Sequence, residues 1–200
     1  MNRIELLLHL KQQGFDTGII QAFAKVRRER FVPARLKEVA YEDCALPLDF
    51  AGSTISQPST IAFMLSLLDV QEGQRTLEIG SGCGYVLALL AELVGKTGKV
   101  YGIEIDKQLA HRSKKLLNAY ANVSVTHGNG FRGLPRHAPF NRIIVSAAAR
   151  EKPWHLLGQL QEPGVLVAPV CNTLVQLTKR DEKVDENNVP GFVFVPLREN

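Results

Sequence analysis

Apolar residues recur at helical spacing in the first part of the chain. Residues 3–13 and 17–28 each carry apolar side chains three or four positions apart, and Gly14 separates them, so the pattern predicts two amphipathic helices. Residues 40–57 lack such a period and predict a long loop. Pro58 then stands where a helix can begin, because proline is favoured at the first helical position, and the apolar residues after it predict a buried helix face.

From residue 75 onward, short apolar runs alternate with helical patterns. The predicted strands are residues 76–79, 99–105, 122–126, 140–146 and 165–170. The predicted helices are residues 86–94, a helix that Asp106 caps and that continues to Tyr120, and a helix that Pro153 opens. Residues 174–179 and 192–197 are predicted to form a last strand pair, joined by the charged residues 179–188.

This order of elements predicts an α/β fold. A chain of 200 residues favours one domain, so we expect a single α/β domain. Strands that alternate with helices imply a mostly parallel sheet that is covered on both faces. The predicted fold class is therefore a Rossmann-like doubly wound, mostly parallel sheet with an antiparallel C-terminal strand pair and extra N-terminal helices.

Composition and charge exclude several classes of function. The 24 basic and 20 acidic residues leave a net charge of +4 that is spread along the chain, and nucleic-acid binders instead cluster their basic residues. No window reaches the roughly 18 apolar residues of a membrane span. The first residues are typical of an amphipathic helix and not of a signal peptide.

The three cysteines, Cys44, Cys83 and Cys171, are far apart in the sequence. This spacing favours neither a disulfide framework nor a zinc site, and the histidines show no metal-like spacing, so we expect no metal. Free thiols in this pattern predict a cytoplasmic protein.

The stretch between the first predicted strand and its helix is rich in glycine. Gly80, Gly82 and Gly84 alternate there, which allows positive φ angles and a close approach of a ligand to the backbone. A dinucleotide site has the spacing G-x-G-x-x-G, whereas this chain has Tyr85 at the last of those positions and an acid, Glu78, before the turn. The pattern favours a cofactor-binding turn over a tight turn without a ligand, and it resembles the adenosylmethionine-binding turn of class I methyltransferases.

Glu104 ends the second predicted strand, 24 residues after Gly80. An acid at the tip of this strand can accept hydrogen bonds from the two ribose hydroxyls of a nucleoside. A solvated acid at the start of a helix is the alternative. Next to the glycine-rich turn, the ribose role is preferred.

Eight segments together carry a resemblance to one family. They are Arg30–Pro33, Ala40–Asp43, Ala45–Pro47, Thr54–Pro58, Leu77–Tyr85, His127–Gly130, Pro139–Ala149 and Phe194–Leu197. Over nearly its whole length the chain resembles protein-L-isoaspartate O-methyltransferases. The sequence Thr-Ile-Ser-Gln-Pro is far more specific to this family than the glycine-rich turn alone.

The resemblance implies methyl transfer from S-adenosylmethionine, with S-adenosylhomocysteine as the product, to the α-carboxylate of L-isoaspartyl residues in damaged proteins. It implies an active-site serine at Ser56, although helix capping ahead of Pro58 is the alternative for Ser56 and Thr54. The cofactor-binding residues that it implies are Thr54, Glu78, Gly80, Ser81, Gly82, Gly84, Glu104, Asn129 and Gly130. Residues 1–57 then form the N-terminal helices and a substrate-side loop, and residues 58–200 the cofactor-binding core.

The chain departs from the family pattern at four places. Asn129 stands where the family has an aspartate that contacts adenine, and Asn141 replaces a second aspartate that we expect to be structural. Residues 49–53 and Val86 replace a Gly-Gln run and a glutamine near the substrate mouth. A diverged O-methyltransferase that acts on another peptide or small-molecule carboxylate is therefore the alternative function. We expect isoaspartyl peptides and proteins as partners, a monomer, and no contact with nucleic acid or membranes.

Overall fold

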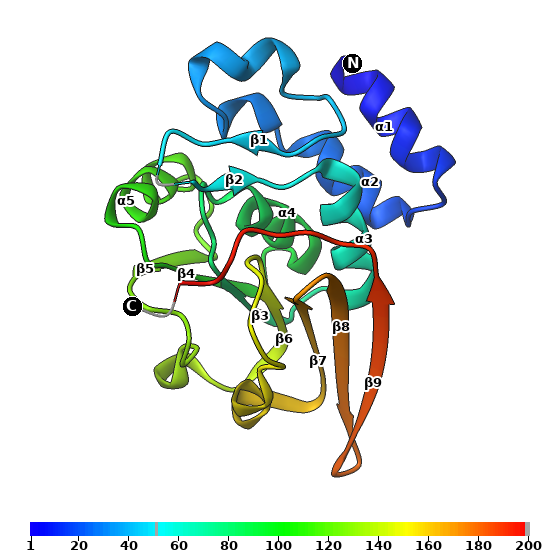
Figure 1. The fold of residues 1–200 in the computed structure, drawn as a ribbon, viewed down its shortest axis with the longest axis vertical. Helices are drawn as coiled ribbons and strands as arrows, with labels where there is room; N and C mark the ends of the chain where they lie inside the picture. The colour runs from blue at the N-terminus through cyan, green and yellow to red at the C-terminus, as the bar shows by residue number, and fades with distance from the viewer. Residues whose placement is uncertain (51, 199–200) are drawn as a thin grey trace.

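The centre of the molecule is a seven-stranded sheet. The structure, a computed structural model, describes residues 1–50 and 52–198. The sheet consists of β3 (Arg75–Ile79), β4 (Lys99–Glu104), β5 (Val123–His127), β6 (Phe140–Val145), β7 (Leu160–Val170), β8 (Thr173–Arg180) and β9 (Lys183–Pro190). The strand order is β5-β4-β3-β6-β7-β8-β9, with the β7–β8 and β8–β9 pairs antiparallel and all other neighbouring pairs parallel (Figure 1). The predicted fold class is confirmed.

Five α-helices precede or connect these strands. They are α1 (Arg3–Gln12), α2 (Thr17–Lys25), α3 (Pro58–Leu68), α4 (Tyr85–Val94) and α5 (Lys107–Leu116). The Asp106 side chain caps α5 by accepting hydrogen bonds from the amides of Gln108 and Leu109, as the sequence predicts. The helix is shorter than predicted, because Leu117 leaves the helical conformation and is buried in the core. None of the described helices is both long and apolar enough to cross a membrane.

The two faces of the sheet are covered by different kinds of element. Side chains of all five α-helices belong to one hydrophobic cluster with residues such as Val100 and Ile144 of the sheet. The opposite face packs against the short 3-10 helix η4 (Trp154–Gln159) and the segment around η3 (Pro135–His137). The predicted helix at Pro153 is therefore a 3-10 helix that Pro153 precedes. Since β7 begins at Leu160, too few residues remain for a longer helix.

The prediction of the last strand pair is wrong in its second member. The partner of β8 is β9, which lies within the charged stretch, and not residues 192–197. β9 is an edge strand with exposed side chains and therefore carries no apolar pattern. Residues 192–197 instead cross the carboxyl ends of the parallel strands (Figure 1), where Phe192 stacks on Phe63 and Pro196 forms a bridge with Ala148.

The predicted loop of residues 40–57 contains a short ribbon. Its strands are β1 (Leu46–Pro47) and β2 (Thr54–Ile55), which pair antiparallel next to the start of α3. The 3-10 helices η1 (Arg28–Arg30) and η2 (Ala34–Val39) connect α2 to this ribbon. The segment that holds Thr54 and Ser56 is thus tied to a neighbouring strand on one side and to a helix on the other.

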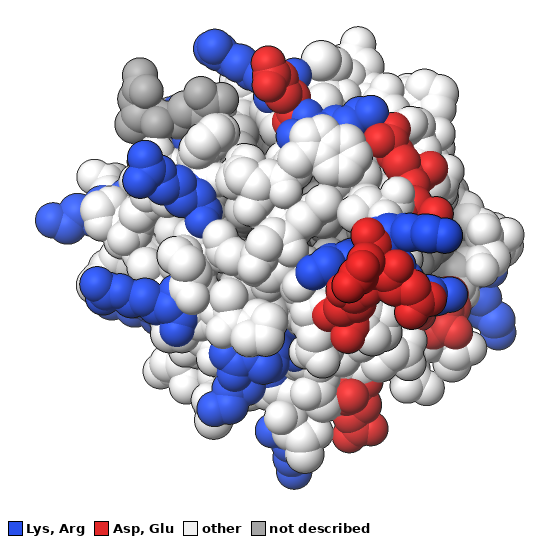
Figure 2. Space-filling model, turned by 90° about the horizontal axis from the view of Figure 1, so that it is seen from below, with Lys and Arg blue, Asp and Glu red and all other residues white. Residues whose placement is uncertain are grey.

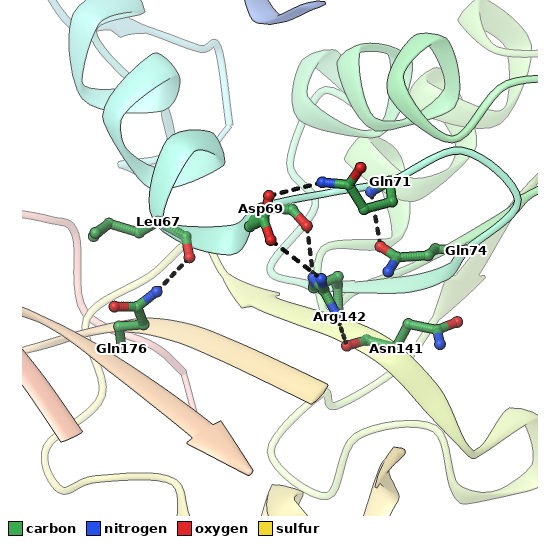
Figure 3. A network of polar contacts seen from close by, with 7 residues as sticks. All are labelled: Leu67, Asp69, Gln71, Gln74, Asn141, Arg142 and Gln176. Atoms are coloured by element: carbon green, nitrogen blue, oxygen red, sulfur yellow. Dashed lines mark hydrogen bonds and ion pairs between the residues drawn. The ribbon is translucent and has the colours of Figure 1, made fainter. Parts of the chain in front are cut away.

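A polar network fixes the end of α3 to the sheet (Figure 3). The buried Arg142 of β6 donates from Nε to the carbonyl oxygen of Asp69, over 2.9 Å, and pairs with the Asp69 carboxylate. Gln176 of β8 donates to the carbonyl oxygen of Leu67 over 2.6 Å. These bonds satisfy carbonyl groups that every helix leaves free at its C-terminus. They set the position of α3 on the sheet.

We expect the substitution Arg142→Met to lower the free energy of unfolding by about 2 kcal/mol, because hydrogen bonds from a buried guanidinium to carbonyl oxygens and an ion pair with the Asp69 carboxylate are lost. Urea denaturation of the purified protein measures this loss. Affinity for a ligand at the opposite end of the sheet is expected to stay within twofold of the unsubstituted protein. A free energy of unfolding equal to that of the unsubstituted protein would contradict the anchoring role.

Candidate functional site

The glycine-rich turn lies at the carboxyl end of β3. Gly80, Gly82 and Gly84 have φ angles of 76°, 51° and 87°, which other residues rarely adopt. The amides of Gly80 and Ser81 donate to the carbonyl oxygen of Ile103 over 2.9 and 3.1 Å. The turn is therefore held against the end of β4 by backbone hydrogen bonds.

The predicted glycines have two different surroundings. A Cβ atom at Gly82 would meet no atom within 4 Å, so this glycine faces open space. A Cβ atom at Gly84 would lie 2.8 Å from Leu117 Cδ1, and one at Gly130 would lie 2.7 Å from Ile79 Cγ2. Of these three glycines, Gly82 leaves room for a ligand, whereas Gly84 and Gly130 allow close packing of the core.

Glu104 is bound to the turn by its carboxylate. Its Oε2 accepts a hydrogen bond from the Gly82 amide over 2.7 Å, and its Oε1 accepts one from the Asp106 amide over 2.8 Å. The residue is 6% exposed and lines a cavity. A carboxylate has about four acceptor positions, so two remain free for a ligand.

Glu78 is buried in β3 with one oxygen unsatisfied. Its Oε1 accepts from the Ser146 hydroxyl over 2.7 Å, and its Oε2 has no hydrogen-bond partner among the described residues. Burial, with a smaller contribution from the nearby Glu104, raises the pKa of Glu78 to about 8, although the Ser146 bond acts in the opposite direction. The Ser81 hydroxyl is also buried and unpartnered. Such groups are arranged to meet polar atoms of a ligand.

Two adjoining cavities bring most of the predicted residues together. The larger, of about 310 Å³, is lined by Thr54, Gly80, Gly82 and Glu104, and also by Ile105, Ser146, Ala147 and residues 195–198. The smaller, of about 40 Å³, is lined by Ser56, Glu78, Ser81 and Phe194, among others. Gly80, Gly82 and Thr54 belong to both cavities, so the two form one site.

Three predicted residues lie outside these two cavities. Gly84 packs against α5, and Gly130 lines a separate cavity of about 340 Å³ that also includes Leu197. The exposed Asn129 accepts a hydrogen bond from the amide of Phe131 through its Oδ1, over 2.8 Å. Its amide oxygen therefore already closes a turn, which is the local role that asparagine often has.

Ser56 does not cap the helix that follows it. The N-cap of α3 is Gln57, and the Ser56 hydroxyl forms no hydrogen bond with any described residue. The serine is half-buried and lines the smaller cavity. Its hydroxyl is therefore free to bind a ligand.

Apart from Asn129, the departures from the family pattern separate into two groups. Val86 lines the smaller cavity, and Gly52 and Ser53 line the larger one, while Ala51 lies outside the described residues. Asn141 lies at the far end of β6, where its Oδ1 accepts from the Arg75 amide over 2.8 Å. The first group is therefore part of the site, and Asn141 has the structural role expected of it.

Several residues of the site carry no predicted role. Ser146 follows β6, and residues 194–198 reach the site from the other end of the sequence. The signal for Ser146 was its position at the end of the predicted strand 140–146, because the carboxyl ends of parallel strands gather where ligands bind. Residues 194–198 were expected in a strand, so their pattern gave no such signal.

The geometry fits a ligand that joins an amino acid to a nucleoside. The unpartnered oxygen of Glu78 can accept from an ammonium group, and the two free acceptor positions of Glu104 can accept from a pair of ribose hydroxyls. Gly82 leaves space for the chain between these groups. S-adenosylmethionine has these features in this order.

Comparisons with known proteins give one consistent match. The family model described as protein-L-isoaspartate(D-aspartate) O-methyltransferase matches residues 1–200. A protein-L-isoaspartate O-methyltransferase of Pyrobaculum islandicum is 42% identical, over 98% of this chain and 100% of that protein. A protein-L-isoaspartate O-methyltransferase 2 of Archaeoglobus fulgidus is 43% identical, over 98% of this chain and 92% of that protein.

Solved structures agree with the sequence comparisons. A protein-L-isoaspartate O-methyltransferase superposes with a TM-score of 0.91 and 28% identity, over 98% of this chain and 65% of that longer chain. A protein-L-isoaspartate O-methyltransferase of Plasmodium falciparum, solved in complex with S-adenosyl-L-homocysteine, superposes with a TM-score of 0.88 and 27% identity. This second match covers 100% of both chains.

The surroundings of the glycines predict two different effects of substitution. We expect Gly82→Ala to weaken S-adenosylmethionine binding at least tenfold, because the new methyl group enters the open cavity. Its positive φ angle costs about 1–2 kcal/mol of stability. Gly130→Ala serves as the comparison, and we expect it to lower stability through overpacking against Ile79 and Ile103. Calorimetric titration and thermal unfolding measure both effects, and unchanged cofactor affinity of Gly82→Ala contradicts the assignment.

The raised pKa of Glu78 predicts a pH-dependent stability of the ligand-free protein. The folded state holds the proton up to about pH 8, whereas the unfolded chain releases it near the ordinary value of 4.5. Stability is therefore lost as the pH rises from 4.5 to 8. We expect Glu78→Gln to raise the melting temperature at pH 8 and to leave it unchanged at pH 4.5. A variant that is less stable at pH 8 would show that Glu78 is not strained by burial.

Proposed function

The chain belongs to the protein-L-isoaspartate(D-aspartate) O-methyltransferase family, and we propose that the site at the carboxyl ends of β3 and β4 carries its reaction. The protein transfers a methyl group from S-adenosylmethionine to the α-carboxylate of L-isoaspartyl residues in damaged proteins, which is a repair function. The observation that carries the site assignment is the unpartnered Glu78 oxygen beside the open space at Gly82.

The cofactor-binding residues divide by the part of the cofactor that each suits. Glu78 Oε2 accepts from the α-ammonium group, and the buried Ser81 hydroxyl is available to the carboxylate at the same end. Glu104 accepts from the ribose hydroxyls through its free lone pairs. S-adenosylmethionine supplies an electrophilic methyl group on a sulfonium sulfur.

The remaining predicted residues shape this site. Gly80, Gly82 and Gly84 give the turn its form, and Thr54 lies beside the cofactor on the substrate side. Asn129 and Gly130 lie toward the adenine end. Gly130 lines the separate cavity of about 340 Å³, and Leu197 lines both this cavity and the cavity of about 310 Å³ at the glycine-rich turn. Because Asn129 offers a neutral acceptor in place of a carboxylate, its bond to an adenine amino group is weaker than the family's aspartate provides.

Ser56 orients the substrate. A carboxylate with an ordinary pKa near 4 is ionised at neutral pH and needs no general base to attack a methyl group. The free hydroxyl of Ser56 donates a hydrogen bond to this carboxylate and directs it toward the cofactor. Phe194 and Ile55 line the same small cavity and keep water away from the reacting groups.

We propose that the protein acts as a monomer in the cytoplasm and does not bind nucleic acid. Cys44, Cys83 and Cys171 are free thiols, and Cys44 and Cys171 are exposed, which suits a reducing compartment. Figure 2 shows Lys and Arg side chains scattered over one face and acidic side chains gathered on part of it. A scattered arrangement of this kind lacks the continuous basic surface of nucleic-acid binders.

The substrate assignment predicts a strict difference between two peptides. We expect methyl transfer from labelled S-adenosylmethionine to an L-isoaspartyl peptide and none to the matched aspartyl peptide. Ser56→Ala is expected to lower kcat on the order of tenfold or more, because one oriented hydrogen bond is lost, while the cofactor dissociation constant stays within twofold. Equal activity on both peptides would favour a diverged enzyme for another carboxylate.

A further inference from the structure

The N-terminus of α3 has no cap of its own. The N-cap residue Gln57 forms no side-chain capping bond, and Pro58 occupies the first helical position. The first amides of a helix lack partners within it, so the amide of Ser59 needs an acceptor from elsewhere. Ser56 stands directly before this uncapped end.

The acceptor comes from a distant part of the chain. Asp43, which follows η2, accepts a hydrogen bond from the Ser59 amide through Oδ1, over 2.8 Å. Its Oδ2 accepts from Gln57 Nε2 over 3.1 Å and lies 3.4 Å from Nε2 of His9 in α1. A negative charge at a helix N-terminus also interacts favourably with the helix dipole.

The environment of Asp43 keeps this carboxylate charged. Its side chain is 14% exposed, and burial alone raises the pKa of a carboxyl group. The hydrogen bonds from Ser59 and Gln57 outweigh burial, and the pKa of Asp43 is lowered. The residue therefore acts as a permanent acceptor at neutral pH.

Ser56 is held only through its neighbours. Its hydroxyl has no hydrogen-bond partner among the described residues. On one side, Thr54 and Ile55 pair with Pro47 and Leu46 in the ribbon, and on the other side Asp43 binds Gln57 and Ser59. The direction of the serine side chain thus depends on these two attachments.

We propose that Asp43 is a positioning residue for methyl transfer: it holds the Gln57–Ser59 turn and thereby aims Ser56 at the substrate carboxylate. This rests on the role of Ser56 proposed above. Asp43 itself lines neither cavity of the site, so it acts through Ser56 and not by contact with cofactor or substrate. A misdirected serine binds the substrate carboxylate less well in the transition state, while the cofactor pocket stays intact.

The test is a double-mutant cycle with Asp43→Ala and Ser56→Ala, assayed as methyl transfer to the isoaspartyl peptide. We expect Asp43→Ala to lower kcat about tenfold, because the oriented hydrogen bond from Ser56 is lost. The dissociation constant of S-adenosylmethionine, measured by calorimetry, is expected to stay within twofold. In the Ser56→Ala background, Asp43→Ala is expected to lower kcat less than twofold further, since the residue through which it acts is gone.

Two further variants keep the test independent of folding. Asp43→Asn retains one oxygen that can cap Ser59 but loses the second acceptor for Gln57, so we expect a folded protein with a several-fold lower kcat. Glu42→Gln is the control, because Glu42 is the adjacent acid and pairs with the N-terminal amine. We expect this control to keep full activity.

The outcomes separate this inference from the proposed function. An Asp43→Ala effect that is equally large in both backgrounds, or an unchanged kcat in Asp43→Ala, overturns the positioning role. A parallel loss of cofactor affinity overturns it too, because a general structural defect would then explain the result. An absence of isoaspartyl methylation in the unsubstituted protein, or full activity of Ser56→Ala, removes instead the proposed function or the role of Ser56.

Discussion

The hydrogen bond from the Gly82 amide to the Glu104 carboxylate is the contact on which the site depends. It joins the turn after β3 to the end of β4 over 2.7 Å, at the edge where parallel strands end. The bond requires the positive φ angles of the turn, and these require glycine. It also leaves part of the Glu104 carboxylate facing the cavity, so one interaction both shapes the backbone and presents an acceptor.

Helix α3 connects the sheet to the substrate-side segment and fixes the position of that segment. Its C-terminal end is bound by Arg142 and Gln176, and its N-terminal end by Asp43. A helix fixed at both ends cannot slide along the sheet, so the segment just before it keeps its place relative to the glycine-rich turn. Precise placement of reacting groups is the main means of accelerating a reaction whose nucleophile is already ionised. If Ser56 has the role proposed for it, a rigid surrounding of this residue contributes directly to the rate of methyl transfer.

Local signals in the sequence were sufficient for most of the fold. The parallel strands follow from their apolar runs, and the cap at Asp106 and the turn at residues 80–84 follow from residue types with one dominant use. β9 was not predicted because an exposed edge strand has no apolar period. Residues 192–197 were predicted as a strand because they are mostly apolar, but in the structure this segment covers the site. The different surroundings of Gly82 and Gly130 and the cap that Asp43 supplies depend on contacts across the chain, which a sequence pattern does not encode.

The larger cavity is walled by segments from distant parts of the sequence, with Thr54 on one side and Val195 to Arg198 on another. A bound molecule that touches both walls connects them as a reversible cross-link would, and it closes a loop that contains most of the chain. A ligand that binds the folded state and not the unfolded chain stabilises the folded state by mass action. A cofactor that occupies this cavity would therefore join the substrate-side ribbon to residues 195–198 and make any opening that separates these two segments less favourable.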